Sequence, residues 1–377
     1  MRSDSPYVLF CAGEDSGDSI GEPLVKKVVA DARFAVAGSG GARMQKAGLD
    51  PLVDFENLPV SGIGDVLPKY LTLRKSFERL KMALESPDCK GFVAIDYPGF
   101  NMKLVRLAEK LKKPCLYVAP PQVWAWKKKR AEDLAKNSFV KLAVFFDFEE
   151  AVYRETGCNV VRVQHPFVNS ESGIRNEKLY LEENTSLRGN SATAAISSSH
   201  CLLLPGSRKS QALRNLPIFL KAVQGCPDVV VIAARQELVP VFEKFGARVI
   251  VAPQKAQDRA ALYRSAKYSI TAPGTATLEL ALSGCPMLVC AKPDLLTYCL
   301  GRLFIKTKYF ALPNIILNRM EFPECFVTPW EGRDVLRQEF VSYSSISHKD
   351  VSVELREKNC AGKTLDSLMA EFLCKLV

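Results

Sequence analysis

The sequence is poor in the residues that build metal centres and covalent cross-links. Its only histidines lie far apart and show no metal-ligand spacing: His165, His200 and His348. The 12 cysteines form no CxxC pair, and most stand in apolar runs, as Cys11, Cys115 and Cys290 do, where a thiol behaves as a small hydrophobic group. We therefore predict no metal site, and reduced cysteines in a cytosolic protein; a disulfide framework is the alternative.

Long apolar runs are also missing. No run approaches the ~18 residues of a membrane-spanning helix, and the nearest one, LLTYCLGRLFI, is interrupted by Arg302. The first residues, MRSDSPYVLFCAGED, contain too short an apolar core for a signal peptide. We predict a protein that is not integral to a membrane, although it could lie on the surface of one.

Acidic residues are fewer than basic ones. Asp and Glu number 41 against 51 Lys and Arg, which gives a net charge of +10. This charge favours anionic partners, namely phosphates, nucleic acid or an acidic membrane surface. Because the sequence contains no nucleic-acid recognition module, we expect no nucleic-acid partner.

Short apolar runs alternate with helical patterns along most of the 377 residues. Such alternation indicates parallel sheets that helices cover on both faces. We predict an α/β protein with two Rossmann-like domains that face a central cleft. The runs that read as buried strands are 7–13, 34–38, 91–96, 114–120 and 141–146 in the first half, and 201–206, 228–234, 247–252, 268–274 and 286–292 in the second.

Composition suggests the domain boundaries. Residues 169–199 are rich in Ser, Asn, Glu and Gly, which predicts a linker or exposed insertion between domains at 1–168 and 200–350. Residues 351–377 form a helical segment that we expect to cross back to the first domain. The apolar stripe of this segment fits one face of a helix that packs on a core: Leu365, Leu368, Met369, Phe372, Leu373 and Leu376.

Two polar stretches follow predicted strands of the first half. In AGEDSGD (12–18), Gly13 and Gly17 allow a tight turn, and Ser16 or Asp18 could cap the next helix. The stretch is not GxGxxG and its Glu14 disfavours a phosphate, so it suits sugar hydroxyls; a plain capped turn is the alternative.

In AIDYPGFN (94–101), Asp96 ends a strand and is a candidate general base. Its alternative role is a cap for the following helix.

Two further stretches follow strands of the second half. PGSRKSQ (205–211) lacks the spacing of a nucleotide-triphosphatase loop, but its Gly-Ser turn opens a helix and Arg208 offers a forked donor to phosphate. Gly274 and Thr275 open a second helix, and Glu279, one turn further on, could accept the hydroxyls of a ribose. For PGSRKSQ the alternative is a surface turn with solvated charges. For Glu279 it is a position on a solvent-facing side of the helix.

Two segments combine apolar residues with cations. Trp124 and Trp126 stand beside the run Lys127–Arg130, which fits sugar stacking, core packing or an interfacial belt, with the cations facing water or an anionic lipid headgroup. The segment 60–77 fits either an interfacial helix or an amphipathic helix packed on the first sheet. Its apolar residues are Val60, Ile63, Val66, Leu67, Tyr70, Leu71 and Leu73, and its cations include Lys69, Arg74 and Lys75.

Seven stretches resemble, in order, the bacterial lipid-A-disaccharide synthase family of GT-B glycosyltransferases. They are AGEDSGD, AGSGGARMQKAG, AIDYPGFN, VAPPQVWAWKKKR, LLPGSR, PGTATLELAL and KTKYFALPNIIL, and they span roughly residues 6–320. QVWAWKKKR together with LLPGSR and GTATLE is more specific than any fragment alone.

The resemblance implies an inverting transferase that joins UDP-2,3-diacylglucosamine to 2,3-diacylglucosamine 1-phosphate, with a β-1,6-linked disaccharide 1-phosphate and UDP as products. It implies that Asp96 deprotonates the acceptor 6-hydroxyl and that Arg208 stabilises the departing UDP, without a metal or cofactor. It places the donor in the second domain, at Gly206, Ser207, Gly274, Thr275, Glu279 and Asn314. It places the acceptor cleft in the first domain, at Gly13, Glu14, Ser16, Gly17, Asp18, Trp124 and Trp126.

The resemblance also implies a peripheral protein on the cytoplasmic face of the inner membrane, and a homodimer is possible. This chain departs from the family pattern at Gly99, Pro273 and Gln164, where the family usually has a second acid, Ser and Gly. The other functions that we consider are another UDP-sugar enzyme of this fold, either a peptidoglycan-type transferase or an epimerase, and a non-catalytic membrane-associated binder.

Overall fold

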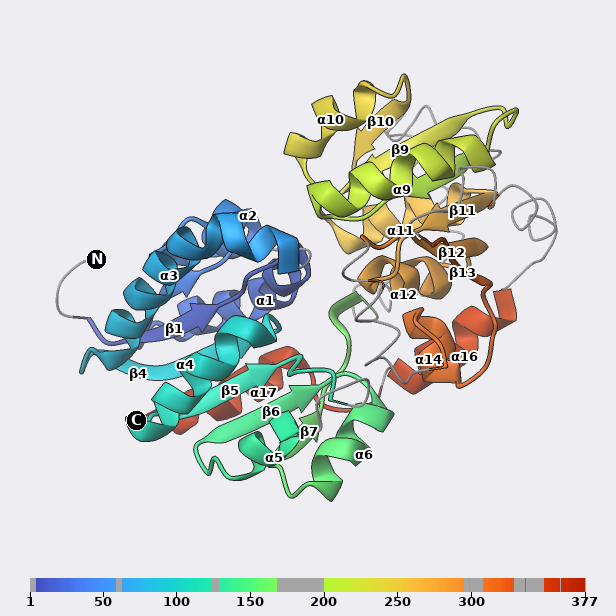
Figure 1. Ribbon diagram of the computed structural model, residues 1–377. Coiled ribbons are helices and arrows are strands. Elements are labelled where there is room, and N and C mark those ends of the chain that lie inside the picture. The colour runs from blue at the N-terminus through green and yellow to red at the C-terminus, as the bar shows by residue number, and fades with distance from the viewer. Residues whose placement is uncertain are drawn as a thin grey trace. The chain divides into compact units, whose positions relative to one another are not determined.

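The chain divides into two compact units, each built around its own parallel sheet (Figure 1). Unit 1 comprises Met1–Pro166 and Ala361–Val377, and unit 2 comprises Phe167–Cys360. The computed structural model describes residues 5–58, 63–123, 129–167, 200–294, 298, 308–328, 336, 349–359 and 361–376. Trp124, Trp126, Val60 and the predicted linker 169–199 lie outside these residues.

Unit 1 contains a seven-stranded sheet in the order β3-β2-β1-β4-β5-β6-β7, and all its strand pairs are parallel. Five consecutive buried residues form β1, which explains its place inside the sheet. The strands are β1 Tyr7–Cys11, β2 Ala35–Ser39, β3 Asp50–Pro51, β4 Cys89–Ile95, β5 Cys115–Val118, β6 Val140–Val144 and β7 Val160–Arg162.

Helices cover both faces of this sheet. Because parallel crossovers are right-handed, α1 and α2 cover one face, and α3 and α4, which pack together, cover the other. The helices are α1 Asp15–Asp31, α2 Ala42–Lys46, α3 Ile63–Glu85, α4 Pro98–Lys110, α5 Lys129–Ala135 and α6 Asp147–Glu155, with a 3-10 turn η1 at Phe55–Asn57.

The C-terminal helix α17, Leu365–Cys374, belongs to unit 1 and packs beside α1 (Figure 1). It lies so close to the sheet that a β-carbon at Gly91 in β4 would stand 3.1 Å from the ring of Phe372. The predicted apolar stripe faces this core, since Leu365, Leu368, Met369, Phe372 and Leu373 are buried. The return of the C-terminal helix to the first domain is therefore confirmed, whereas residues 351–360 of the predicted segment belong to unit 2.

Unit 2 contains a six-stranded sheet in the order β10-β9-β8-β11-β12-β13, again with parallel pairs. Its strands are β8 Cys201–Leu204, β9 Val229–Ala233, β10 Arg248–Val251, β11 Tyr268–Thr271, β12 Met287–Ala291 and β13 Glu324–Phe326. The helices are α9 Lys209–Ala222, α10 Val239–Glu243, α11 Ala256–Ser265, α12 Thr275–Leu282, α14 Leu312–Leu317 and α16 Lys349–Asn359, with a 3-10 turn η3 at Gln236–Leu238.

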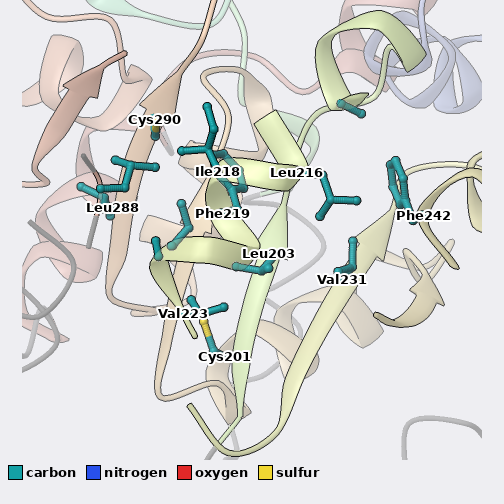
Figure 2. Packing of buried hydrophobic residues seen from close by; sticks show 14 of the residues in the cluster. Cys201, Leu203, Leu216, Ile218, Phe219, Val223, Val231, Phe242, Leu288 and Cys290 are labelled. Atoms are coloured by element: carbon teal, nitrogen blue, oxygen red, sulfur yellow. The ribbon is translucent and has the colours of Figure 1, made fainter. Parts of the chain in front are cut away.

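The inner face of α9 forms a hydrophobic core with the sheet of unit 2 (Figure 2). Leu216 and Phe219 of α9 are fully buried in one cluster with Leu203 of β8, Val231 of β9 and Leu288 of β12. This packing fixes the start of α9 against the end of β8, where the predicted phosphate loop lies. The two Rossmann-like α/β domains expected from the sequence are confirmed.

Candidate active site

Each sheet has one point at which the order of its strands reverses. In unit 1 this point lies between β1 and β4, and in unit 2 it lies between β8 and β11. Ligands of open α/β sheets bind outside the carboxyl ends of the strands at such a point. The predicted stretches 12–18 and 96–101 follow β1 and β4, whereas 205–211 and 273–279 follow β8 and β11. Within each unit, the two predicted stretches are therefore neighbours.

Asp96 stands at a sharp turn where β4 ends. Asp96 and Tyr97 have φ angles of 47° and 50°, in the left-handed region that residues other than glycine rarely adopt. The Asp96 amide donates to the Val118 carbonyl at 2.9 Å, as the last rung of the ladder to β5. Asp96 is half-buried at the switch point.

Gly13 allows the turn after β1 to approach the turn after β4. A β-carbon at Gly13 would lie 2.4 Å from the ring of Tyr97. This ring has little freedom to move, because its hydroxyl donates to the Leu58 carbonyl at 2.8 Å and its face stacks on Phe100. The absence of a side chain at Gly13 thus lets the turns after β1 and β4 lie close together.

Asp18 is buried and holds the start of α2. Its carboxylate accepts hydrogen bonds from the backbone amides of Arg43 at 3.1 Å and Met44 at 3.0 Å. Burial raises the pKa of Asp18, against the opposing effect of these hydrogen bonds. Asp18 therefore shapes this loop, and its predicted contact with a sugar stays a prediction. Gly17 is also buried, whereas Glu14 and Ser16 are half-buried.

The loop after β8 presents two arginines. Gly206 has a φ of 118°, and a β-carbon there would also lie 2.7 Å from Oε1 of Gln211. Ser207 and Arg208 are half-buried, and Arg208 is the N-cap residue of α9. Arg235, which follows β9, donates from Nη2 to the Ser207 carbonyl at 3.3 Å. Arg235 therefore places a second guanidinium group beside the predicted phosphate loop.

The residues at the start of α12 are exposed to solvent. Gly274 and Thr275 are exposed, and Gly274 has φ 154° and ψ −169°, a conformation essentially reserved for glycine. Thr277 holds this conformation, because its hydroxyl donates to the Gly274 carbonyl at 2.7 Å. The N-cap residues of these two helices, Arg208 of α9 and Gly274 of α12, form no side-chain cap hydrogen bond.

Glu279 forms an ion pair with Arg259. Two parallel hydrogen bonds join them, Nε to Oε2 at 3.0 Å and Nη2 to Oε1 at 3.1 Å. Their side chains are 16% and 8% exposed, respectively, so Glu279 is not the solvent-facing glutamate of the alternative interpretation. Arg259 also donates to the carbonyls of Pro253 and Gln254, which fixes the guanidinium group and with it the carboxylate.

Asn314 is fully buried, and both ends of its amide are used within unit 2. Nδ2 donates to the Phe322 carbonyl at 2.7 Å and to Glu324 at 2.8 Å, while Oδ1 accepts from the amides of Glu321 and Phe322. Glu324 in turn accepts from the amide of Ala311 at the start of α14. Asn314 therefore holds α14, which packs against α12; its predicted contact with the donor stays a prediction.

The polar side chains that hold these loops were not predicted from the sequence. Asn101, Asn215 and Arg259 are buried and bind backbone carbonyl groups at the strand ends or in loops. The available signal was a polar residue at an apolar helix position, as in GFNMKL and LRNLPI. Among the described residues, no group of His, Cys, Asp and Glu could hold a metal ion.

A search of known protein families identifies the chain over most of its length. The family described as lipid-A-disaccharide synthetase matches residues 8–362. The lipid-A-disaccharide synthase of Syntrophus aciditrophicus is 34% identical over 334 residues, which cover 85% of this chain and 84% of that protein. That of Nitrosococcus oceani is 32% identical over 341 residues, which cover 86% and 84%.

Solved structures support the fold. The glycotransferase of kitacinnamycin superposes with a TM-score of 0.54 at 14% identity, over 99% of this chain and 100% of that one. UGT89C1 of Arabidopsis thaliana gives 0.54 at 13% identity, over 98% and 100%. The sequence matches and this fold together show that the chain belongs to the lipid-A-disaccharide synthase family of GT-B glycosyltransferases.

Proposed function

We propose that the protein carries out its family's reaction with Asp96 as the general base and Arg208 at the leaving group. The reaction condenses UDP-2,3-diacylglucosamine with 2,3-diacylglucosamine 1-phosphate. The proposal rests on where Asp96 and Arg208 lie in their sheets. Each residue follows the carboxyl end of a strand at the point where the strand order of its sheet reverses.

Unit 2 would bind the UDP moiety. The first turns of α9 and α12 offer backbone N–H groups and the positive ends of two helix dipoles, which attract phosphate oxygens. Ser207 and Arg208 lie at one of these turns, and Gly274 and Thr275 lie at the other. As the bond to the sugar breaks, Arg208 would stabilise the negative charge that develops on UDP.

Glu279 would accept hydrogen bonds from the ribose hydroxyls. An ionised carboxylate has about four acceptor positions, and Arg259 occupies one on each oxygen. The remaining positions suit the two adjacent hydroxyls of a ribose.

Unit 1 would bind the acceptor. Asp96 would take the proton from the 6-hydroxyl as this oxygen attacks the anomeric carbon, and Glu14 and Ser16 would contact the sugar from the neighbouring loop. A positioned general base contributes roughly 10²–10⁴-fold to the rate.

We further propose that α3 contacts an anionic membrane surface on the cytoplasmic side of the inner membrane, where diacylated substrates would reside. Tyr70 is 54% and Leu71 is 69% exposed, and the exposed Arg74 and Lys75 lie about one turn further along. Although α3 also packs against β2 and β4, exposed apolar residues beside cations favour contact of its outer face with a lipid surface. No helix within the described residues is long and apolar enough to cross a membrane.

The test is incubation of the purified protein with the UDP-diacylglucosamine donor and the monophosphate acceptor, with the product identified by mass spectrometry. Asp96→Asn should still bind UDP but form little disaccharide, because an amide cannot accept the proton. If the variant loses UDP binding as well, Asp96 has a structural role. If it turns over normally, the proposed base is wrong.

A further inference from the structure

The carbonyl oxygen of Asp96 is held by two side chains from outside its own turn. Nδ2 of Asn101, in α4, lies 2.8 Å from it, and the hydroxyl of Tyr117, in β5, lies 3.1 Å from it. Both interactions converge on the residue whose backbone has the unfavourable φ of 47°. Such a conformation is strained and persists only where the surroundings hold it.

Asn101 links the two strand ends that meet at the switch point. Its Nδ2 atom also lies 3.1 Å from the Cys11 carbonyl at the end of β1 and 3.2 Å from the Ile95 carbonyl at the end of β4. The side chain is fully buried. Three carbonyl groups around one nitrogen fix the orientation of the amide, because its oxygen in that place would face three acceptors.

Tyr117 comes from the strand on the other side of β4 and is fully buried. Burial, together with the nearby charge of Asp96, holds the pKa of its phenol well above the usual value. The hydroxyl therefore keeps its proton and acts as a donor. Asn101 and Tyr117 thus approach the Asp96 carbonyl from different elements.

We propose that Asn101 and Tyr117 are positioning residues, which hold the backbone of Asp96 in its left-handed conformation and so direct its carboxylate to the acceptor hydroxyl. This inference rests on the proposed role of Asp96. It goes beyond that role, because it assigns the geometry of the base to two side chains that do not touch the substrate.

Tyr117→Phe tests the proposal with the least disturbance, because it removes only the hydroxyl. We expect kcat to fall about tenfold, with the KM for the UDP-sugar within about twofold of its original value, since the donor loops belong to unit 2. Tyr7→Phe is the matched control. Its hydroxyl also donates to a backbone carbonyl, that of Ala83, but from the opposite end of β1, so kcat should stay unchanged. An equal fall in kcat in both variants would overturn the proposal.

A double-mutant cycle separates this inference from the proposed function. Because Tyr117 acts only through Asp96, Tyr117→Phe should lower the residual single-turnover rate of Asp96→Asn by less than about twofold. A further tenfold loss in that background would show that Tyr117 acts independently. If Asp96→Asn is inactive but Tyr117→Phe is fully active, only the positioning role of Tyr117 is wrong. If Asp96→Asn is active, the proposed role of Asp96 as general base is wrong.

Asn101→Ser provides a second variant, since a hydroxyl can donate to only one of the three carbonyl groups. Its kcat should fall further than that of Tyr117→Phe, with UDP affinity retained as proof that unit 2 is intact. Thermal unfolding followed by circular dichroism identifies the folded fraction of each variant. A folded Asn101→Ser enzyme with unchanged kcat would contradict the proposal.

Discussion

The guanidinium group of Arg259 and the carboxylate of Glu279 meet in two parallel hydrogen bonds of 3.0 and 3.1 Å, between α11 and α12 of unit 2. The planar fork of arginine matches a carboxylate in a way that the single ammonium of lysine cannot. The same guanidinium group reaches the Pro253 and Gln254 carbonyls. Arg259 therefore orients Glu279 as well as neutralising it.

Arg259→Lys should weaken donor binding more than it slows the chemical step. Lysine keeps the charge but cannot hold both carboxylate oxygens, so we expect the KM for the UDP-sugar to rise about tenfold and kcat to change by less than threefold. Steady-state kinetics with a varied donor concentration measure this. Arg248→Lys is the control, because Arg248 pairs with Asp228 at an exposed site of the same unit. If Arg259→Lys raises the KM for the UDP-sugar no more than Arg248→Lys does, Arg259 does not orient Glu279 for donor binding.

Arg208→Ala should lower the transfer rate strongly while the protein stays folded. The loss of a charged donor at the leaving group costs roughly 2–4 kcal/mol of transition-state stabilisation, or about 30- to 1,000-fold in rate. Single-turnover product formation measures the effect. Lys209→Ala, at the exposed neighbouring position, should change the rate by less than threefold. Near-normal turnover in a folded Arg208→Ala protein would remove Arg208 from the mechanism.

His165 should make the stability of the protein depend on pH. Burial lowers the pKa of its imidazole to about 4, whereas a histidine in an unfolded chain titrates near pH 6.5. The unfolded chain therefore binds a proton between these values that the folded protein does not bind. The contribution of the neutral His165 to the free energy of unfolding is therefore fully present above about pH 6.5. As the pH falls from 6.5 toward 4, the free energy of unfolding decreases by about 1.4 kcal/mol per pH unit.

Urea unfolding at pH 7 and pH 5 measures this loss. His165→Gln should reduce the difference between the two pH values, since glutamine does not titrate. The sequence contains three histidines, so proton NMR can follow each imidazole separately. A His165 resonance that titrates near pH 6.5 in the folded protein would disprove the prediction.

Binding to anionic vesicles should depend on both salt and the apolar residues of α3. Each cation near the surface contributes roughly 1 kcal/mol of attraction, which salt screens. Replacement of both Leu71 and Leu73 by serine should weaken binding further, and a vesicle flotation assay measures the bound fraction. Val29→Ser is the control, because Val29 is an exposed apolar residue on α1. Unchanged binding of the α3 variant would point instead to the basic run at 127–130.

Local patterns in the sequence determined the strands, the turns that follow them and the family. Buried parallel strands need continuous apolar residues, as in YVLFC and CLLL, and a strand-to-helix turn favours glycine where φ is positive, as at Gly206 and Gly274. These requirements involve residues close together in the chain. They therefore identified the loops around Asp96, Arg208 and Glu279 before the fold was known.

Only the tertiary structure decided how those loops are held. Asn101 binds the carbonyl of Cys11 across 90 positions of the chain, and Tyr117 reaches Asp96 across 21. Backbone carbonyl groups carry no side-chain identity, so no residue type at position 11 or 96 reveals such a contact. For the same reason the sequence does not show that the polar atoms of Asp18 and Asn314 are engaged by backbone groups and, for Asn314, also by Glu324. The hydrogen-bond partner of a buried polar side chain depends on which backbone the fold brings beside it.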